Sequence, residues 1–132
     1  MVIDDILELK SKCNFGDEIG RSYQLTAREV GCIFKIAAHE EITSKELSRL
    51  MGLSASRGSR IISGLSLRGF ISVEYDRIDK RSYRLSLTEA GKACYEDILE
   101  QKRLCEERLT AQLSEEERKI VRQGLDLLIQ VM

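Results

Sequence analysis

Apolar residues recur at helical spacing along most of the chain, and several of these stretches begin at a helix cap. Capping boxes of the form Ser/Thr-x-x-Glu start at Thr26, Thr43 and Ser114, and such boxes satisfy the free amide groups of a first helical turn. Together with the apolar spacing, they predict helices over residues 2–10, 26–39, 43–52, 54–68, 88–111 and 114–132. Gly52 ends the third helix, where glycine suits a tight turn. The third and fourth helices therefore have the spacing of a helix-turn-helix.

The period changes from helical spacing to alternation in residues 70–75 and again in residues 82–87. Alternating apolar and polar residues are typical of strands. The connector between them, residues 76–81, is polar and charged, so the segment predicts a β-hairpin with a basic tip. A helix pair followed by such a hairpin forms a winged helix-turn-helix, and we expect a mainly α fold with a small β-hairpin wing.

The last two helices are long and amphipathic, and little chain remains to cover their apolar stripes. The stripes are formed by Cys94, Ile98, Cys105 and Leu109 on one helix, and by Val121, Gly124, Leu125, Leu128 and Met132 on the other. A partner subunit is the simplest cover. We therefore expect a single domain over residues 1–132, with an N-terminal helix and connection (1–24), a winged part (25–88) and C-terminal dimerisation helices (89–132).

Composition limits the class of protein. With 132 residues, 42% hydrophobic and 33% charged, the chain is long enough for one domain and too apolar for a disordered tail. No apolar run approaches the roughly 18 to 20 residues that a membrane span needs. The N-terminus is acidic and lacks the core of a signal peptide. We expect a cytoplasmic protein with no membrane partner.

Positive charge is concentrated in the middle of the chain, although the net charge of the whole is only -1. Residues 54–84 contain seven basic and three acidic side chains, whereas the segments on either side are net negative. Such a distribution gives a local potential suited to an anionic partner. A solvated basic face without a partner remains the alternative on charge alone.

One face of the helix predicted over residues 54–68 has the chemistry of a DNA-reading surface. At 100° per residue, Gly58, Ile61, Ile62 and Leu65 fall on one side, and Ser56, Ser59, Arg60 and Ser63 on the other, with Arg57 at the border. Short serine side chains let a helix approach the floor of the major groove, and an arginine can donate two hydrogen bonds to guanine.

The predicted hairpin tip adds a second basic feature. Arg77, Lys80 and Arg81 lie next to the strands, and a thin basic loop can reach the narrow minor groove, where the potential is most negative. Asp79 is interpreted as an orienting partner for the guanidinium of Arg81. A simple turn residue is an equally good interpretation of Asp79.

These features occur in an order that resembles the MarR family of bacterial and archaeal transcription regulators. The matching segments are Leu25-Thr26, residues 43–54, residues 59–71, the stretch Asp79-Lys80-Arg81 with the following Leu87-Thr88-x-x-Gly91, and Leu113-Ser114-x-x-Glu117. Coverage runs from about Leu25 to the end. Three features depart from the family pattern: Gly58 stands at an inward position, Val73 replaces a commonly basic residue, and the segment before Leu25 is short.

The resemblance implies a homodimer whose two winged domains bind a pseudo-palindromic operator in double-stranded DNA. It implies groove contacts by Ser54, Ser56, Arg57, Ser59 and Arg60, a wing contact by Arg81, and phosphate contacts by Thr43 and Ser44. Members typically repress nearby genes until a small ligand or an oxidant changes the spacing of the two recognition helices. Some members sense oxidants through a cysteine near the first helix, and Cys13 lies in that region.

Catalytic, metal and cofactor chemistry have no visible motif in the chain. The four cysteines form no Cys-x-x-Cys pair, and buried, reduced thiols are the simplest interpretation in a cytoplasmic protein. We therefore expect no enzyme activity, no metal and no cofactor. Two alternatives to DNA binding remain: a winged-helix module that binds protein, and a thiol-based redox sensor or enzyme, which needs a cysteine of depressed pKa.

Overall fold

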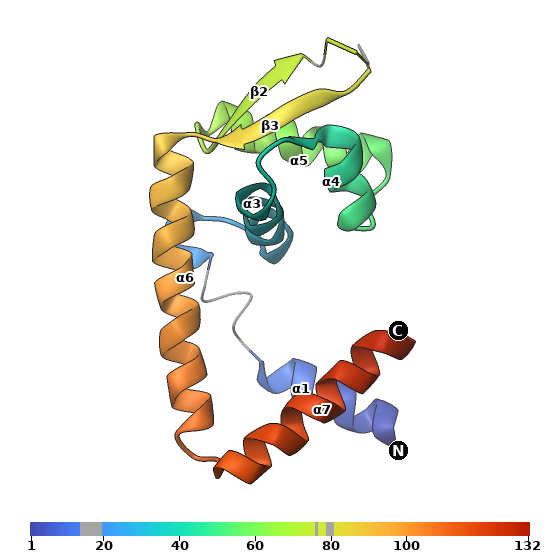
Figure 1. The fold of residues 1–132 in the computed structure, drawn as a ribbon, viewed down its shortest axis with the longest axis vertical. Helices are drawn as coiled ribbons and strands as arrows, with labels where there is room; N and C mark the ends of the chain where they lie inside the picture. Colours follow the sequence, from blue (N-terminus) through green and yellow to red (C-terminus); the bar gives the residue numbers. More distant parts are fainter. Residues whose placement is uncertain (14–19, 76, 79–80) are drawn as a thin grey trace. The chain divides into compact units, whose positions relative to one another are not determined.

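The computed structural model describes residues 1–13, 20–75, 77–78 and 81–132 of the chain. Its internal contacts group into two compact units, Met1–Leu99 and Glu100–Met132. Helix α6 (Glu89–Thr110) belongs partly to each unit. Figure 1 shows the described elements, which are mostly helical apart from one small sheet.

The first unit contains the helix-turn-helix and the hairpin expected from the sequence. Its elements are α1 (Val2–Lys12), the 3-10 helix η1 (Arg21–Tyr23), α3 (Ala27–Ala38), β1 (Ile42–Thr43), α4 (Ser44–Leu50), α5 (Ala55–Leu67), β2 (Ile71–Tyr75), β3 (Tyr83–Leu87) and the first part of α6. Gly52 and Gly69, which follow α4 and α5, have φ angles of 63° and 81°. Glycine adopts this left-handed conformation without the steric cost of a side chain.

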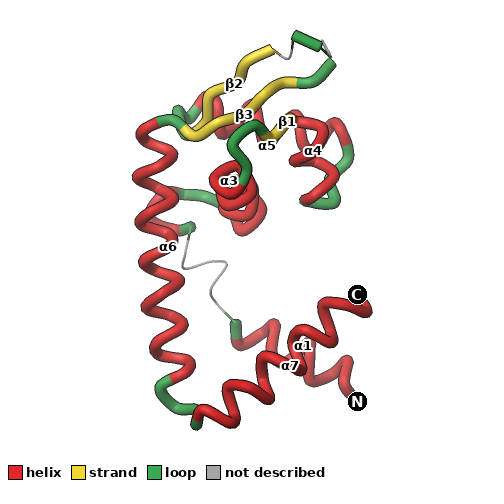
Figure 2. The backbone as a smooth tube through the Cα atoms, viewed as in Figure 1, coloured by secondary structure: helices red, strands yellow, loops and turns green. Residues whose placement is uncertain are grey.

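The sheet has three antiparallel strands in the order β1-β3-β2 (Figure 2). Ile42 of β1 lies opposite Leu85 of β3, and Ile71 of β2 lies opposite Leu87. The alternation pattern predicted β2 and β3 but missed β1. A strand of two residues is too short to show a period, and β1 forms because the chain before α4 passes along the free edge of β3.

An apolar core joins the sheet to α3, α4, α5 and the first part of α6. Ile33 of α3, Leu65 of α5, Leu85 of β3 and Ile98 of α6 are each at most 1% exposed. Burying a side chain of this size stabilises a fold by about 1.5 to 3 kcal/mol. The elements that contribute to this core are therefore held together, which fixes α5 against the hairpin.

The remaining helices have a different character. Helix α1 and helix α7 (Glu115–Val131) contain no buried residue. Ser114 and Glu117 form the predicted capping box at the start of α7, with bonds of 3.1 and 2.7 Å. Of the apolar stripe predicted on α6, Cys105 is buried whereas Leu109 is 51% exposed. No helix among the described residues is long and apolar enough to span a bilayer.

Candidate nucleic-acid interface

Helix α5 presents the two faces that its sequence predicts. Ser54 caps its start, and the Ser54 hydroxyl accepts a hydrogen bond of 3.2 Å from the amide of Arg57. The buried positions are Gly58, Ile62 and Leu65. The predicted contact residues on the opposite face, Ser54, Ser56, Arg57, Ser59 and Arg60, are all exposed.

Gly58 of α5 faces Ser48 of α4. A Cβ atom at this position would be 2.0 Å from the Ser48 hydroxyl oxygen and 3.1 Å from the Ser48 Cβ. A side chain at position 58 would therefore displace the Ser48 hydroxyl and press against the Ser48 Cβ. The departure from an apolar residue, noted in the sequence, has a packing cause.

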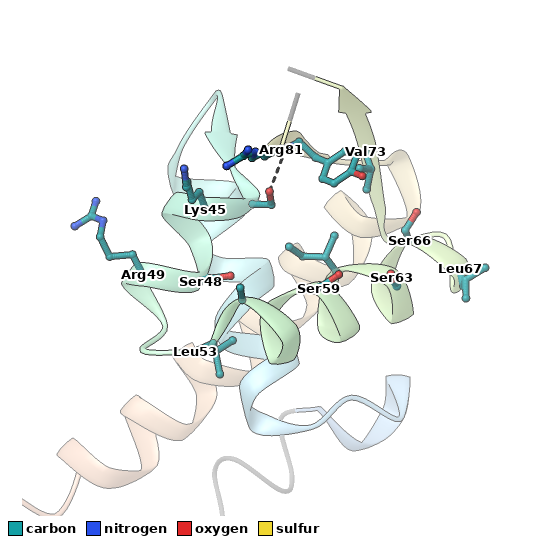
Figure 3. A pocket seen from close by; sticks show the side chains of 14 residues that line it. Lys45, Ser48, Arg49, Leu53, Ser59, Ser63, Ser66, Leu67, Val73 and Arg81 are labelled. Carbon is teal, nitrogen blue, oxygen red and sulfur yellow. Dashed lines mark hydrogen bonds between the residues drawn. The ribbon is translucent and has the colours of Figure 1, made fainter. Parts of the chain in front are cut away.

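A groove of about 850 Å³ runs between α4, α5 and the hairpin (Figure 3). Five serines line it, together with the cationic side chains of Lys45, Arg49 and Arg81. None of the described residues that line it is acidic. A concave surface with this charge attracts an anionic ligand and disfavours acidic partners.

Sequence reasoning assigned Thr43 and Ser44, at the start of α4, to this surface but missed Lys45 and Arg49. Lys45 and Arg49 lie one helical turn apart on α4, and both line the groove together with Ser48 (Figure 3). Their spacing of four residues, just after the Thr43 cap, was a usable signal. It was not decisive, because the sequence does not show which face of a helix of seven residues turns toward the wing.

The two predicted phosphate contacts at the start of α4 have structural partners. The Thr43 hydroxyl accepts the amide of Glu46 at 3.1 Å, and thus caps the helix. The Ser44 hydroxyl accepts the amide of Tyr83 at 3.0 Å and lies 3.5 Å from the Ser82 hydroxyl. These bonds tie α4 to β3, and the role of Thr43 and Ser44 in phosphate contact stays a prediction.

The wing is described only in part. Arg77 and Arg81 are exposed, and Arg81 lines the groove. Asp79 and Lys80 lie outside the described residues, so the predicted pairing of Asp79 with Arg81 stays a prediction. Val73, at the start of the wing, packs against the core opposite Leu85, which explains an apolar side chain at that position.

Three of the four cysteines lie in surroundings that shield the thiol from solvent. Cys32, Cys94 and Cys105 are buried, and Cys13 is exposed. Burial, reinforced by the nearby Glu29, raises the pKa of Cys32 to about 11. Burial and the Asp97 carboxylate likewise raise the pKa of Cys94. A thiol enzyme needs the opposite shift, and the described residues contain no cluster of groups suited to a metal ion.

Comparison with known proteins agrees with this geometry. A family model described as "MarR family" matches residues 23–82, which include α3, α4, α5 and β2 and end just before β3. The chain is 23% identical over 104 residues to the uncharacterized HTH-type transcriptional regulator YwaE of Bacillus subtilis (strain 168). That match covers 79% of this chain and 61% of YwaE, so the chain spans less than two thirds of this relative.

Two solved structures share the fold. A crystal structure of MarR has a TM-score of 0.78 and 26% identity, and the match covers 98% of this chain and 96% of that one. A mutant MarR from E. coli, complexed with operator DNA, has a TM-score of 0.79 and 19% identity, with 97% of this chain and 94% of that one covered.

The protein is a winged helix-turn-helix protein. Residues 23–82 match the model of the MarR family, the family that the sequence motifs resemble. The curated relatives that match are named as transcriptional regulators, which agrees with the expectation of a regulator and not an enzyme.

Proposed function

We propose that this chain is a homodimeric transcription regulator that binds a specific sequence in double-stranded DNA and acts in the cytoplasm. The observation that carries the proposal is the basic groove beside α5, whose described lining contains three cations and no acid. The MarR of similar fold that was crystallised with operator DNA supports the same function.

The exposed face of α5 would enter the major groove. Its serines are short enough to let the helix backbone approach the base edges, and Arg60 is exposed and able to donate two parallel hydrogen bonds to guanine. Arg57, Ser56 and Ser59 would make the neighbouring contacts. In this arrangement α5 determines which sequence is bound.

The wing and α4 would contact the phosphate backbone and the adjacent minor groove. Arg77 and Arg81 are exposed on either side of the hairpin tip, where guanidinium groups suit a narrow minor groove. Lys80 and Asp79 are assigned to the same loop from the sequence. On α4, Lys45 and Arg49 line the groove and would neutralise phosphates, a contribution that does not depend on base sequence.

A second copy of the chain would cover the helices that have no buried residue. On α7, Val121 and Leu125 are 43% and 44% exposed, and Ile120 is 63% exposed. Apolar surface of this extent on a helix is a common mark of a protein interface. Two copies related by a twofold axis would present two α5 helices to a pseudo-palindromic operator.

The regulatory part of the proposal follows the family. We expect repression that a small ligand or an oxidant relieves, because a change in the spacing of the two recognition helices lowers the affinity for both half-sites at once. Cys13, which is exposed at the end of α1, is the candidate for an oxidant response.

Fluorescence anisotropy tests the assignment of roles within the interface. The probe is a labelled duplex of roughly 30 base pairs, taken from the DNA upstream of the protein's own gene, with a random duplex of equal length for comparison. Arg60→Ala should cost about 1 to 3 kcal/mol on the upstream duplex and little on the random one. Arg49→Ala should weaken both alike and reduce the salt slope by about one unit.

Lys92→Ala is the matched control, because it removes a cation that lies on α6 and pairs with Glu89 at 3.2 Å. It should leave both affinities unchanged. Equal losses for Arg60→Ala on the two duplexes would contradict its role in base recognition. Failure of the wild-type chain to bind any duplex would favour a protein-binding module.

A further inference from the structure

Arg68, at the C-terminal end of the recognition helix α5, connects this helix to a segment that lies far away in the sequence. Its guanidinium donates hydrogen bonds to the backbone carbonyls of Tyr23 and Gln24, the latter at 3.1 Å. It also lies 3.7 Å from the carboxylate of Glu29, whose side chain is only 18% exposed. One side chain thus holds the end of α5 against the start of α3.

Aromatic packing reinforces the same connection. The Arg68 guanidinium lies over the ring of Phe70, 5.2 Å from the ring centroid. The ring of Tyr23 meets Phe70 edge to face, with centroids 6.1 Å apart and planes at 75°. Contacts of both types are favourable. The planar guanidinium is needed here, because the ammonium of lysine neither stacks in this way nor reaches two carbonyls in a fixed fork.

The same segment is bonded to α6 through Tyr23. The Tyr23 hydroxyl donates a hydrogen bond to the carboxylate of Asp97, 74 residues later in the chain. This bond, with a smaller contribution from burial, raises the pKa of Tyr23 to about 12. Asp97 is therefore linked to the end of α5 by two residues in series, Tyr23 and then Arg68.

None of these three side chains lines the basic groove. Their polar groups are bonded within the fold, to Gln24, Glu29 and one another, so we expect their effect on DNA to act through the orientation of α5. Binding surfaces lose affinity when the element that presents them is displaced by even part of an ångström. Helix α6 continues beyond Asp97 to Thr110, so a rotation of α6 about its own axis would act on α5 through this connection.

We propose that Arg68, Tyr23 and Asp97 are positioning residues that couple the orientation of the recognition helix to helix α6, and thereby set the affinity for DNA without touching it. The proposal rests on the DNA-binding function proposed above. It predicts that a change as small as the loss of one phenol oxygen, outside the interface, weakens DNA binding.

The test uses the full-length chain and the labelled upstream duplex, with Tyr23→Phe and Arg68→Lys as the principal variants. Each should bind the duplex roughly three- to tenfold more weakly than the wild type, the range expected for the loss of one or two hydrogen bonds. The salt slope should stay unchanged, because no phosphate contact is removed. The double variant should lose less than the product of the single losses, because both act through one connection.

Conservative variants and a matched control separate positioning from a general loss of stability. Asp97→Asn keeps an oxygen that accepts the phenol hydrogen bond and should retain most of the affinity, whereas Asp97→Ala should match Tyr23→Phe. Tyr95→Phe removes a phenol oxygen from α6, where Tyr95 packs against Phe34 with ring centroids 5.0 Å apart, and should bind as the wild type does. Affinities are compared at a temperature at which circular dichroism shows every variant fully folded.

Two results would overturn the proposal. Variants that bind as tightly as the wild type, or that change the salt slope as a lost phosphate contact does, would show that the connection does not position α5. Absence of binding by the wild-type chain would overturn the proposed function and, with it, this inference. The first outcome leaves DNA binding intact, so the two failures are distinguishable.

Discussion

The winged part of the chain contains amphipathic helices with well-formed caps, and α7 is a helix of the same kind. The two regions differ in what covers the apolar faces of these helices. Helix α3 starts at a complete capping box on Thr26 and buries Cys32, Ile33 and Ile36. Helix α7 starts at an equally complete box on Ser114 and buries nothing. Amphipathic spacing thus predicts that a helix forms, but it does not predict whether residues of the same chain bury the apolar face of that helix.

The largest predicted effect contrasts a leucine from each region. Leu65 is fully buried in α5, and Leu65→Ala should lower the free energy of unfolding by about 2 to 5 kcal/mol at any protein concentration. Leu125 of α7 is 44% exposed, and under the proposed dimer Leu125→Ala should instead raise the dimer dissociation constant by roughly tenfold, or about 1.4 kcal/mol.

Urea unfolding at two protein concentrations and sedimentation equilibrium measure these two quantities. The dimer should make the unfolding midpoint of the wild-type chain depend on concentration. If Leu125→Ala lowered the free energy of unfolding as much as Leu65→Ala does and left association unchanged, the distinction between the two regions would be wrong.

Two glycines, one beside the winged part and one in α7, allow the effect of adding a single Cβ atom to be compared. A Cβ at Gly91, near the start of α6, would lie 2.0 Å from the backbone carbonyl oxygen of Phe70, which has little freedom to move. Gly91→Ala should therefore destabilise the chain by about 1 to 3 kcal/mol. Gly124 of α7 has no atom within 4 Å of the corresponding position, so Gly124→Ala should stabilise the helix by up to about 1 kcal/mol.

Thermal unfolding followed by circular dichroism measures both changes. Because α7 is proposed to face a second copy, the Gly124 variant is also tested for association. Stabilisation by Ala at position 91 would show that the α6 start does not pack as closely as described.

The smallest predicted effect concerns thiols. Cys13 is exposed and should react with an alkylating reagent at neutral pH in the native chain, whereas Cys32 and Cys94 should react only after unfolding. Because the folded-state pKa of Cys32 is raised to about 11 from 9.0, its contribution to stability is complete below pH 9 and is lost as the pH rises toward 11.

Mass spectrometry after timed alkylation gives the order of reaction, and Cys13→Ser is the control. Urea unfolding of wild type and Cys32→Ala between pH 8 and 11 should show the wild type losing more stability on the alkaline side. Rapid native alkylation of Cys32 would contradict its burial.

Most of the fold was predictable because local signals mark its elements. The caps at Thr26, Ser54 and Ser114 place three helix starts, and the alternation in residues 70–75 and 82–87 places two strands. The α5 face was predictable for the same reason, since helical spacing alone decides which side chains oppose Leu65. These signals are local, and the features that they predicted correctly are local as well.

What the sequence did not show depends on tertiary packing. Lys45 and Arg49 belong to the groove only because α4 packs against α5 at Gly58 and is tied to β3 through Ser44. The hydrogen bond from Tyr23 to Asp97 joins residues 74 positions apart, and no periodicity in the sequence indicates such a pair. Strand β1 is likewise a consequence of its neighbour β3, because two residues have no pattern of their own.

The most direct test of the central proposal is the affinity of the pure wild-type protein for the labelled upstream duplex as salt is lowered from roughly 200 to 50 mM. We predict tight binding at low salt, a steep loss of affinity as salt rises, and weaker binding to the random duplex at every salt concentration. No increase in anisotropy with either duplex at the lowest salt, from folded and homogeneous protein, would contradict the assignment of this surface to DNA.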